Sequence, residues 1–311
     1  MRIGIYILLT FTLLTGFFQS GTSQTAISVE PPEVVAVFEA LYRYNLPEAE
    51  KKFKKLYSTS IDPNLIDLTH ANLMWWWLIS GDDSRDYENQ ITVVLNRIIG
   101  RLGQKSVEEM RPDEIFTMIH SYAYLTRVDI YLERYISGVV NLKHTMNYLK
   151  VALGNSDRFD KYMLVSGLYN YFAAVTLAKY PVFLPFFAFA PSSDRQKGFT
   201  LLNKCTRMDN LLIRNESLYY LMKINYQLED NYIRSVEIAD ELLKSYPNNL
   251  IYHYHRFSIL IEAGQKEEAR LAYNQLLKVS ANAPGLNTCQ RNHLVVIARK
   301  RLLKEKINPA I

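Results

Sequence analysis

Histidine is the residue type in this chain best suited to metal binding or to proton transfer near neutral pH. The sequence has six histidines, at positions 70, 120, 144, 253, 255 and 293. No two of them stand three or four residues apart, the spacing that places two ligands on one face of a helix. His253 and His255 are two residues apart, so a helix directs them to different faces. The histidine pattern therefore predicts no metal site.

Carboxylates and glycine-rich turns offer no stronger catalytic candidate. The run "GDDSRD" at 81–86 is acidic, but Asp and Ser before an apolar helical pattern are typical of a helix N-cap. The sequence contains no phosphate-binding glycine motif and no nucleophile elbow. Carboxylates from distant helices could still meet in space, which keeps an enzyme as an alternative. We expect a protein without catalytic activity and without a cofactor.

Aromatic side chains are more numerous candidates for a functional site, and they are suited to binding more than to catalysis. The chain has 22 Tyr and three Trp, and the three Trp stand together in "MWWWL" at 74–78. Successive helical residues turn by about 100°, so Trp75, Trp76 and Trp77 cannot all face one core. One interpretation buries these rings between neighbouring helices on two sides. The alternative places one ring, Trp75 or Trp76, in a groove as a binding anchor.

The elements that would position these side chains are helices. Only 12 Gly and 11 Pro occur, and no Asn-Gly or Asp-Gly hairpin signal is present. Apolar periodicity predicts long helices in segments 65–80, 87–102, 112–136, 139–153, 160–180 and 293–307. Pro31 and Pro32 open another helical pair near the N-terminus. We therefore expect an all-α protein without a convincing strand.

Two segments of equal length repeat one pattern of small and large residues. Residues 216–249 and 250–283 each contain two amphipathic helices, with Ser235 and Ala269 at matching small positions. A small residue there lets two helix backbones approach, and a large neighbour fills the groove beside it. A single hairpin of this kind cannot bury its apolar face alone, so stacking of successive hairpins is expected.

The two segments resemble the tetratricopeptide repeat (TPR) family, whose helix–turn–helix unit is about 34 residues long. The family's first-helix Trp and Gly positions hold other residues here, whereas the small positions and the turns match. The resemblance implies a TPR-like helical-hairpin superhelix, an α-solenoid of about six hairpins with a C-terminal capping helix. It also implies one continuous domain over 25–311 and a groove that binds a protein partner.

In this family, a groove that clamps a carboxylate carries Lys and Asn at set first-helix positions. The corresponding residues here are Tyr220 and Ile224 in one unit and Tyr254 and Ser258 in the next, so that clamp is absent. An aromatic, mildly polar groove favours an extended peptide, an amphipathic helix or a glycan. The candidate partner-binding residues are Tyr220, Ile224, Gln227, Tyr254, Ser258, Trp75, Trp76, Phe183, Phe186 and Phe187.

The last three of these belong to an unusual segment, "KYPVFLPFFAFAPSSDRQKG" at 179–198. Its prolines exclude a regular helix, and Ser193 with Gln196 predicts a capping box for the next helix. Lys179 and the prolines disfavour a membrane span. The interpretations left open are a plug over the helices, a shallow membrane contact, a partner surface, and a lid over a small molecule, lipid or glycan.

The same region is similar to a segment of the eukaryotic inclusion-body-clearance TPR family. In that family a Gly-Leu-aromatic helix, a proline-rich break and an Asp-Arg-x-x-Gly helix start occur together. The matching residues here are Gly167, Leu168, Pro181, Asp194, Arg195 and Gly198. This similarity implies a shared architecture, an irregular helical core flanked by TPR units.

The N-terminus and the composition bear on location. Arg2, an apolar run and small polar residues predict a signal peptide over 1–24, with an uncleaved anchor as the alternative. We therefore expect an exported protein of the periplasm or cell envelope, without a lipobox cysteine. The formal net charge of +5 is mild and scattered, so no nucleic-acid partner and at most peripheral membrane contact are expected. Cys205 and Cys289 could pair in an oxidising compartment, but two buried free thiols are the expectation.

Overall fold

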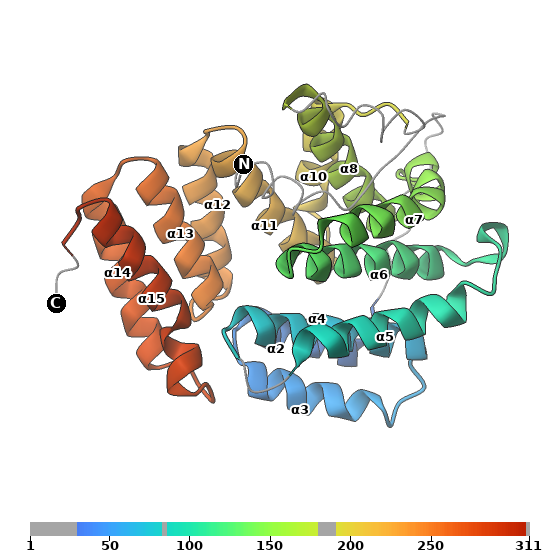
Figure 1. Cartoon of the computed structure of the whole chain (residues 1–311), viewed down its shortest axis with the longest axis horizontal. Coiled ribbons are helices and arrows are strands. Elements are labelled where there is room, and N and C mark those ends of the chain that lie inside the picture. The colour runs from blue at the N-terminus through green and yellow to red at the C-terminus, as the bar shows by residue number, and fades with distance from the viewer. Residues whose placement is uncertain (1–29, 83–85, 180–190, 309–311) are drawn as a thin grey trace. The chain divides into compact units, whose positions relative to one another are not determined.

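The computed structural model describes residues 30–82, 86–179 and 191–308, and its described part contains helices and connections but no strand (Figure 1). The expected all-α class is confirmed. The expected signal peptide, part of the "GDDSRD" run and most of the Phe/Pro segment, with Phe183, Phe186 and Phe187, lie outside the described residues.

Neighbouring helices pack as consecutive pairs, as the expected α-solenoid of helical hairpins requires. Four pairs pack along their lengths: α2 (Pro32–Tyr42) with α3 (Leu46–Leu56), α6 (Pro112–Tyr131) with α7 (Tyr135–Gly154), α8 (Asp160–Lys179) with α10 (Arg195–Cys205), and α13 (Leu250–Glu262) with α14 (Lys266–Ala281). Two further pairs are linked by side chains: α4 (Pro63–Ile79) to α5 (Tyr87–Leu102) by ion pairs, and α11 (Leu211–Gln227) to α12 (Tyr232–Ser245) by a hydrogen bond. A last helix, α15 (Thr288–Lys304), packs on the final pair. A single-turn helix, Val107–Glu109, precedes α6.

One turn geometry closes four of these hairpins. A residue two or three positions beyond the first helix takes a positive φ: 58° at Tyr44, 59° at Glu133, 51° at Asp230 and 71° at Gly264. The following backbone N–H then donates to a carbonyl in the last turn of the first helix, as from Gln265 to Leu260 at 3.0 Å. This is the left-handed helix cap that glycine favours, yet three of the four positions hold other residues.

The described chain divides into two compact units, each with its own core. The first unit contains residues 61–71 and 88–217, with Glu30 at its start, and the second contains 31–60, 72–87 and 218–311. α4 and α11 each contribute one end to each unit.

In the first unit, two glycines let α8 and α10 approach closely. A Cβ added at Gly198 would lie 2.4 Å from the backbone nitrogen of Tyr171, and one at Gly167 would lie 3.0 Å from Leu202. Tyr171 and Phe199 make an edge-to-face contact beside this crossing. The backbone contact explains why residue 198 has no room for a side chain.

In the second unit, the N-terminal hairpin joins the C-terminal hairpins through one buried amide. The Asn249 side chain accepts hydrogen bonds from the first backbone N–H groups of α13 and donates to the carbonyl of Tyr42 at 2.8 Å. The Tyr42 ring also contacts Tyr246 at 5.5 Å. A polar side chain that caps one helix and bonds another segment fixes the register between them.

Two local expectations are corrected. α10 is capped by Asp194, whose carboxylate accepts from the backbone N–H of Lys197, and not by Ser193. The backbone N–H of Asp194 is held by the Asn170 side chain, which sets the start of the helix one residue later than expected. Neither cysteine forms a disulfide, but only Cys205 is buried. Cys289 is exposed, because it lies on the outer side of the first turn of α15.

Candidate functional site

The second unit gathers aromatic and basic side chains across α11 and α13. We call this group the aromatic–histidine cluster; its members are Tyr219, Tyr220, Lys223, Tyr226, Tyr254 and His255. Residues 219, 223 and 226 recur at the spacing that puts them on one face of α11. The Tyr219 ring contacts the rings of Tyr220 and His255 edge to face, at 5.9 and 5.4 Å.

His255 links the cluster by hydrogen bonds through both ring nitrogens. Its Nε2 lies 3.2 Å from the Tyr219 hydroxyl, and its Nδ1 lies 3.2 Å from the Tyr226 hydroxyl. The Gln227 amide donates to the Tyr226 hydroxyl at 2.8 Å. A neutral imidazole has one donor and one acceptor nitrogen, so one of these tyrosine hydroxyls donates to the ring and the other accepts from it.

The electrostatics of the cluster keep these groups in their neutral forms. Burial lowers the pKa of His255, and the charge of Lys223 lowers it further. Burial also raises the pKa of the Tyr226 hydroxyl well above its ordinary value. The cluster therefore has neither a cationic histidine nor a tyrosinate near pH 7, and it presents hydrogen-bonding aromatic surface beside one lysine.

The structure gives the expected groove residues two different environments. Tyr220 and Tyr254 are half-buried in the cluster, and Gln227 is exposed beside it. Ile224 and Ser258, by contrast, are only 1% and 2% exposed, so they belong to the core of the unit. Of the candidate residues on α11 and α13, Tyr220, Gln227 and Tyr254 are therefore the accessible ones.

Sequence reasoning missed Tyr219, Lys223, Tyr226 and His255. The signal that could have found the first three was their helical spacing, which puts them on one side of α11. His255 could be found only through the pairing of α11 with α13, because its partners lie 29 and 36 residues away along the chain.

The three tryptophans face different surroundings, as their spacing requires. Trp77 is buried, whereas Trp75 and Trp76 are half-buried. The Trp76 ring contacts Tyr42 and Tyr44 edge to face, each at 6.1 Å. Packing against the N-terminal hairpin thus accounts for Trp76 and supports the burial interpretation for that ring.

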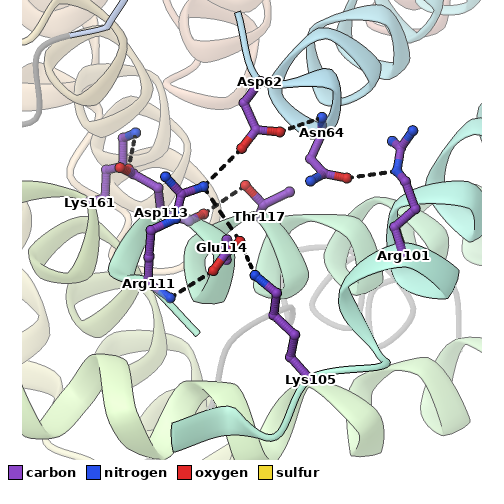
Figure 2. A network of polar contacts seen from close by, with 9 residues as sticks. All are labelled: Asp62, Asn64, Arg101, Lys105, Arg111, Asp113, Glu114, Thr117 and Lys161. Atoms are coloured by element: carbon purple, nitrogen blue, oxygen red, sulfur yellow. Dashed lines mark hydrogen bonds and ion pairs between the residues drawn. The ribbon is translucent and has the colours of Figure 1, made fainter. Parts of the chain in front are cut away.

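The first unit contains a separate network of charged side chains at the start of α6 (Figure 2). Glu114 accepts from Lys105 at 2.7 Å and from the backbone N–H of Arg111 at 2.8 Å, and the Arg111 guanidinium reaches Asp62 at 3.1 Å. Burial alone would raise the pKa of Glu114, but its hydrogen bonds with Lys105 and Arg111 outweigh this and hold it below its ordinary value.

Lys161 continues this network towards α8. Its ammonium lies 2.8 Å from Asp113 and 2.6 Å from Glu30, and 5.3 Å from the centre of the Phe116 ring. Burial lowers the pKa of Lys161, but the two carboxylates outweigh it and raise the pKa above its ordinary value. Each charged side chain of this network is paired with an opposite charge, and these pairs stabilise the packing of α4, α6 and α8 within the unit.

Beside α5, Asp67 binds both Arg97 and Arg101, at 3.1 and 2.5 Å. Asn64, one turn earlier on α4, accepts from Arg101 at 2.9 Å (Figure 2). The Asp67 carboxylate is buried and bound by two half-exposed guanidiniums, so these ion pairs link α4 to α5. They do not leave a basic group positioned for proton transfer.

Within residues 30–82, 86–179 and 191–308, no three His, Cys, Asp or Glu side chains are grouped so that they could hold a metal ion. None of the helices in these ranges combines the length and the apolar character that a membrane-spanning helix needs. In comparisons with known proteins, no family model, no curated protein and no solved structure matches the chain.

Proposed function

We propose that this chain is a non-catalytic helical-hairpin scaffold that binds an extended segment of a protein partner across the aromatic–histidine cluster. The observation that carries the proposal is the repeated placement of Tyr220 and Tyr254. They stand 34 residues apart (254 − 220 = 34) on the first helices of consecutive hairpins, with only part of each ring buried.

The chemistry of the cluster favours a peptide over a charged small molecule. Tyrosine supplies a large, rigid contact area at low entropic cost and is enriched at binding hot spots. Gln227 supplies an amide beside the rings, and Lys223 lies 5.6 Å from the Tyr219 ring centre. An extended segment with apolar side chains and one carboxylate would use all three features.

The location and the rival function rest on segments outside the described residues. We infer an exported protein from residues 1–24, so the proposed partner is a protein of the cell envelope. A binder of a small molecule, lipid or glycan, with 181–191 as its lid, is the alternative. Native mass spectrometry of the purified chain would reveal a retained ligand of that kind and would favour the alternative.

The direct test uses peptides selected from a random displayed library on the full chain. We expect a peptide whose affinity falls at least about 30-fold in the Tyr220→Ala/Tyr254→Ala variant, because hot-spot tyrosines contribute about 2 kcal/mol or more. The matched control is Tyr57→Ala/Tyr131→Ala, which removes two rings that are 61% and 50% exposed elsewhere. Selection of no peptide, or equal loss in both variants, would refute the proposed surface.

A further inference from the structure

The terminal helix α15 exposes a face that the proposed peptide site does not use. We call it the α15 outer face; it consists of Val296, Ile297, Arg299, Lys300, Leu303 and Lys304. Its three apolar members are 46%, 38% and 57% exposed.

The charge on this helix has one sign. Residues 288–304 contain five Lys or Arg and no Asp or Glu. Arg301 pairs with Glu262 on α13, and Arg291 donates to the carbonyl of Ala281. Arg299, Lys300 and Lys304 are exposed and form no ion pair with any residue that the structure describes. These three positive charges are therefore available for contact with an anionic surface.

The opposite side of α15 holds the helix in place. Leu294, Ala298 and Leu302 are buried against the rest of the unit, and Asn287 with Gln290 forms a capping box at its start. The helix is therefore fully formed in the folded chain, and its outer face is available without local unfolding. At about 1.5 Å per residue, its 17 residues give a surface roughly 25 Å long.

We propose that the α15 outer face docks on an anionic lipid membrane. Lys and Arg interleaved with exposed aliphatic side chains are the composition of helices that lie in the membrane interface. Their cations contact lipid headgroups, and their apolar side chains enter the acyl boundary. A second copy of the chain fits poorly, because two such faces would bring like charges together.

The test is co-sedimentation of the full chain with vesicles of phosphatidylcholine, with and without phosphatidylglycerol. We expect binding only to the anionic vesicles, weakening as salt rises. Arg299→Gln/Lys300→Gln/Lys304→Gln should weaken it roughly 100-fold, because each basic residue near an anionic surface contributes about fivefold. The matched control, Lys51→Gln/Lys55→Gln/Lys197→Gln, removes three exposed lysines elsewhere and should bind like wild type.

A second variant separates lipid from a purely electrostatic partner. Val296→Ser/Leu303→Ser keeps all charges and should weaken vesicle binding about tenfold, because apolar area no longer enters the bilayer. Both residues are exposed, so the melting temperature should stay at the wild-type value, and circular dichroism checks this. Failure of wild type to bind anionic vesicles would overturn the proposal. Equal loss in the lysine control, or unchanged binding by the serine variant, would do the same.

Discussion

At the residue scale, Gly198 is the position where one added methyl group should matter most. Its Cβ would lie 2.4 Å from the backbone of Tyr171, so Gly198→Ala must separate α8 from α10. We expect a loss of about 2–3 kcal/mol in the free energy of unfolding, the usual range for overpacking. Gly100→Ala is the control, because nothing lies within 4 Å of that Cβ. It should be neutral or stabilising by up to ~1 kcal/mol. Denaturant titration that finds equal effects would contradict the close crossing.

Histidine protonation gives a second residue-scale prediction. Burial lowers the pKa of His120 to about 4, with Arg127 and Lys161 adding to the effect, and burial also lowers that of His255. Below about pH 6.5 the unfolded chain protonates these histidines, whereas the folded chain protonates His120 only near pH 4 and His255 only near pH 3. Unfolding therefore takes up protons, and the free energy of unfolding falls as the pH is lowered through this window.

The expected slope is up to about 1.4 kcal/mol per pH unit for each histidine. Denaturant titrations at pH 7, 6 and 5, compared with His120→Gln/His255→Gln, would measure it. The variant should lose less stability between pH 7 and 5 than the wild-type chain does. A wild-type stability that stays constant over this range would show that neither ring is held neutral by the fold.

At the element scale, the repeated hairpin turn can be tested by exchanging residues between two of its copies. Asp230 and Gly264 stand 34 residues apart (264 − 230 = 34) in the turns of consecutive hairpins, and both have a positive φ, of 51° and 71°. Asp230→Gly should stabilise the chain, and Gly264→Ala should destabilise it, each by about 1 kcal/mol. Thermal unfolding of the two variants would show opposite shifts. Shifts of the same sign would mean that the two hairpins do not share this turn.

The helices and their pairing into hairpins are the part of the fold that the sequence predicted. Periodicity and the small residues Ser235 and Ala269 predicted helical hairpins, because burial of an amphipathic face is a local requirement. The Ser235 hydroxyl indeed donates to the carbonyl of Met222 on the paired helix, at 2.7 Å. The sequence did not predict Asp194 as the N-cap of α10. The backbone N–H of Asp194 is held by the side chain of Asn170, which lies 24 residues earlier in the chain.

At the scale of the whole molecule, the packing of distant helices determines which side chains are buried, and local sequence patterns do not contain this information. Ile224 and Ser258 were expected in a groove, but their burial depends on which side of each helix meets its neighbours. The contact of Lys161 with Glu30 joins residues 131 positions apart (161 − 30 = 131), and no periodicity encodes such a pair. The aromatic–histidine cluster likewise exists only because α11 and α13 are brought together.

The proposed peptide site lies across the first helices of consecutive hairpins. Its most direct measurement is photo-cross-linking of the selected peptide to full chains that carry p-benzoylphenylalanine in place of Tyr220, Tyr254 or Tyr57. We predict cross-links from positions 220 and 254 and none from position 57, which lies at the end of α3. Bound peptide that cross-links only from position 57, or from neither position of the cluster, would refute the proposed site.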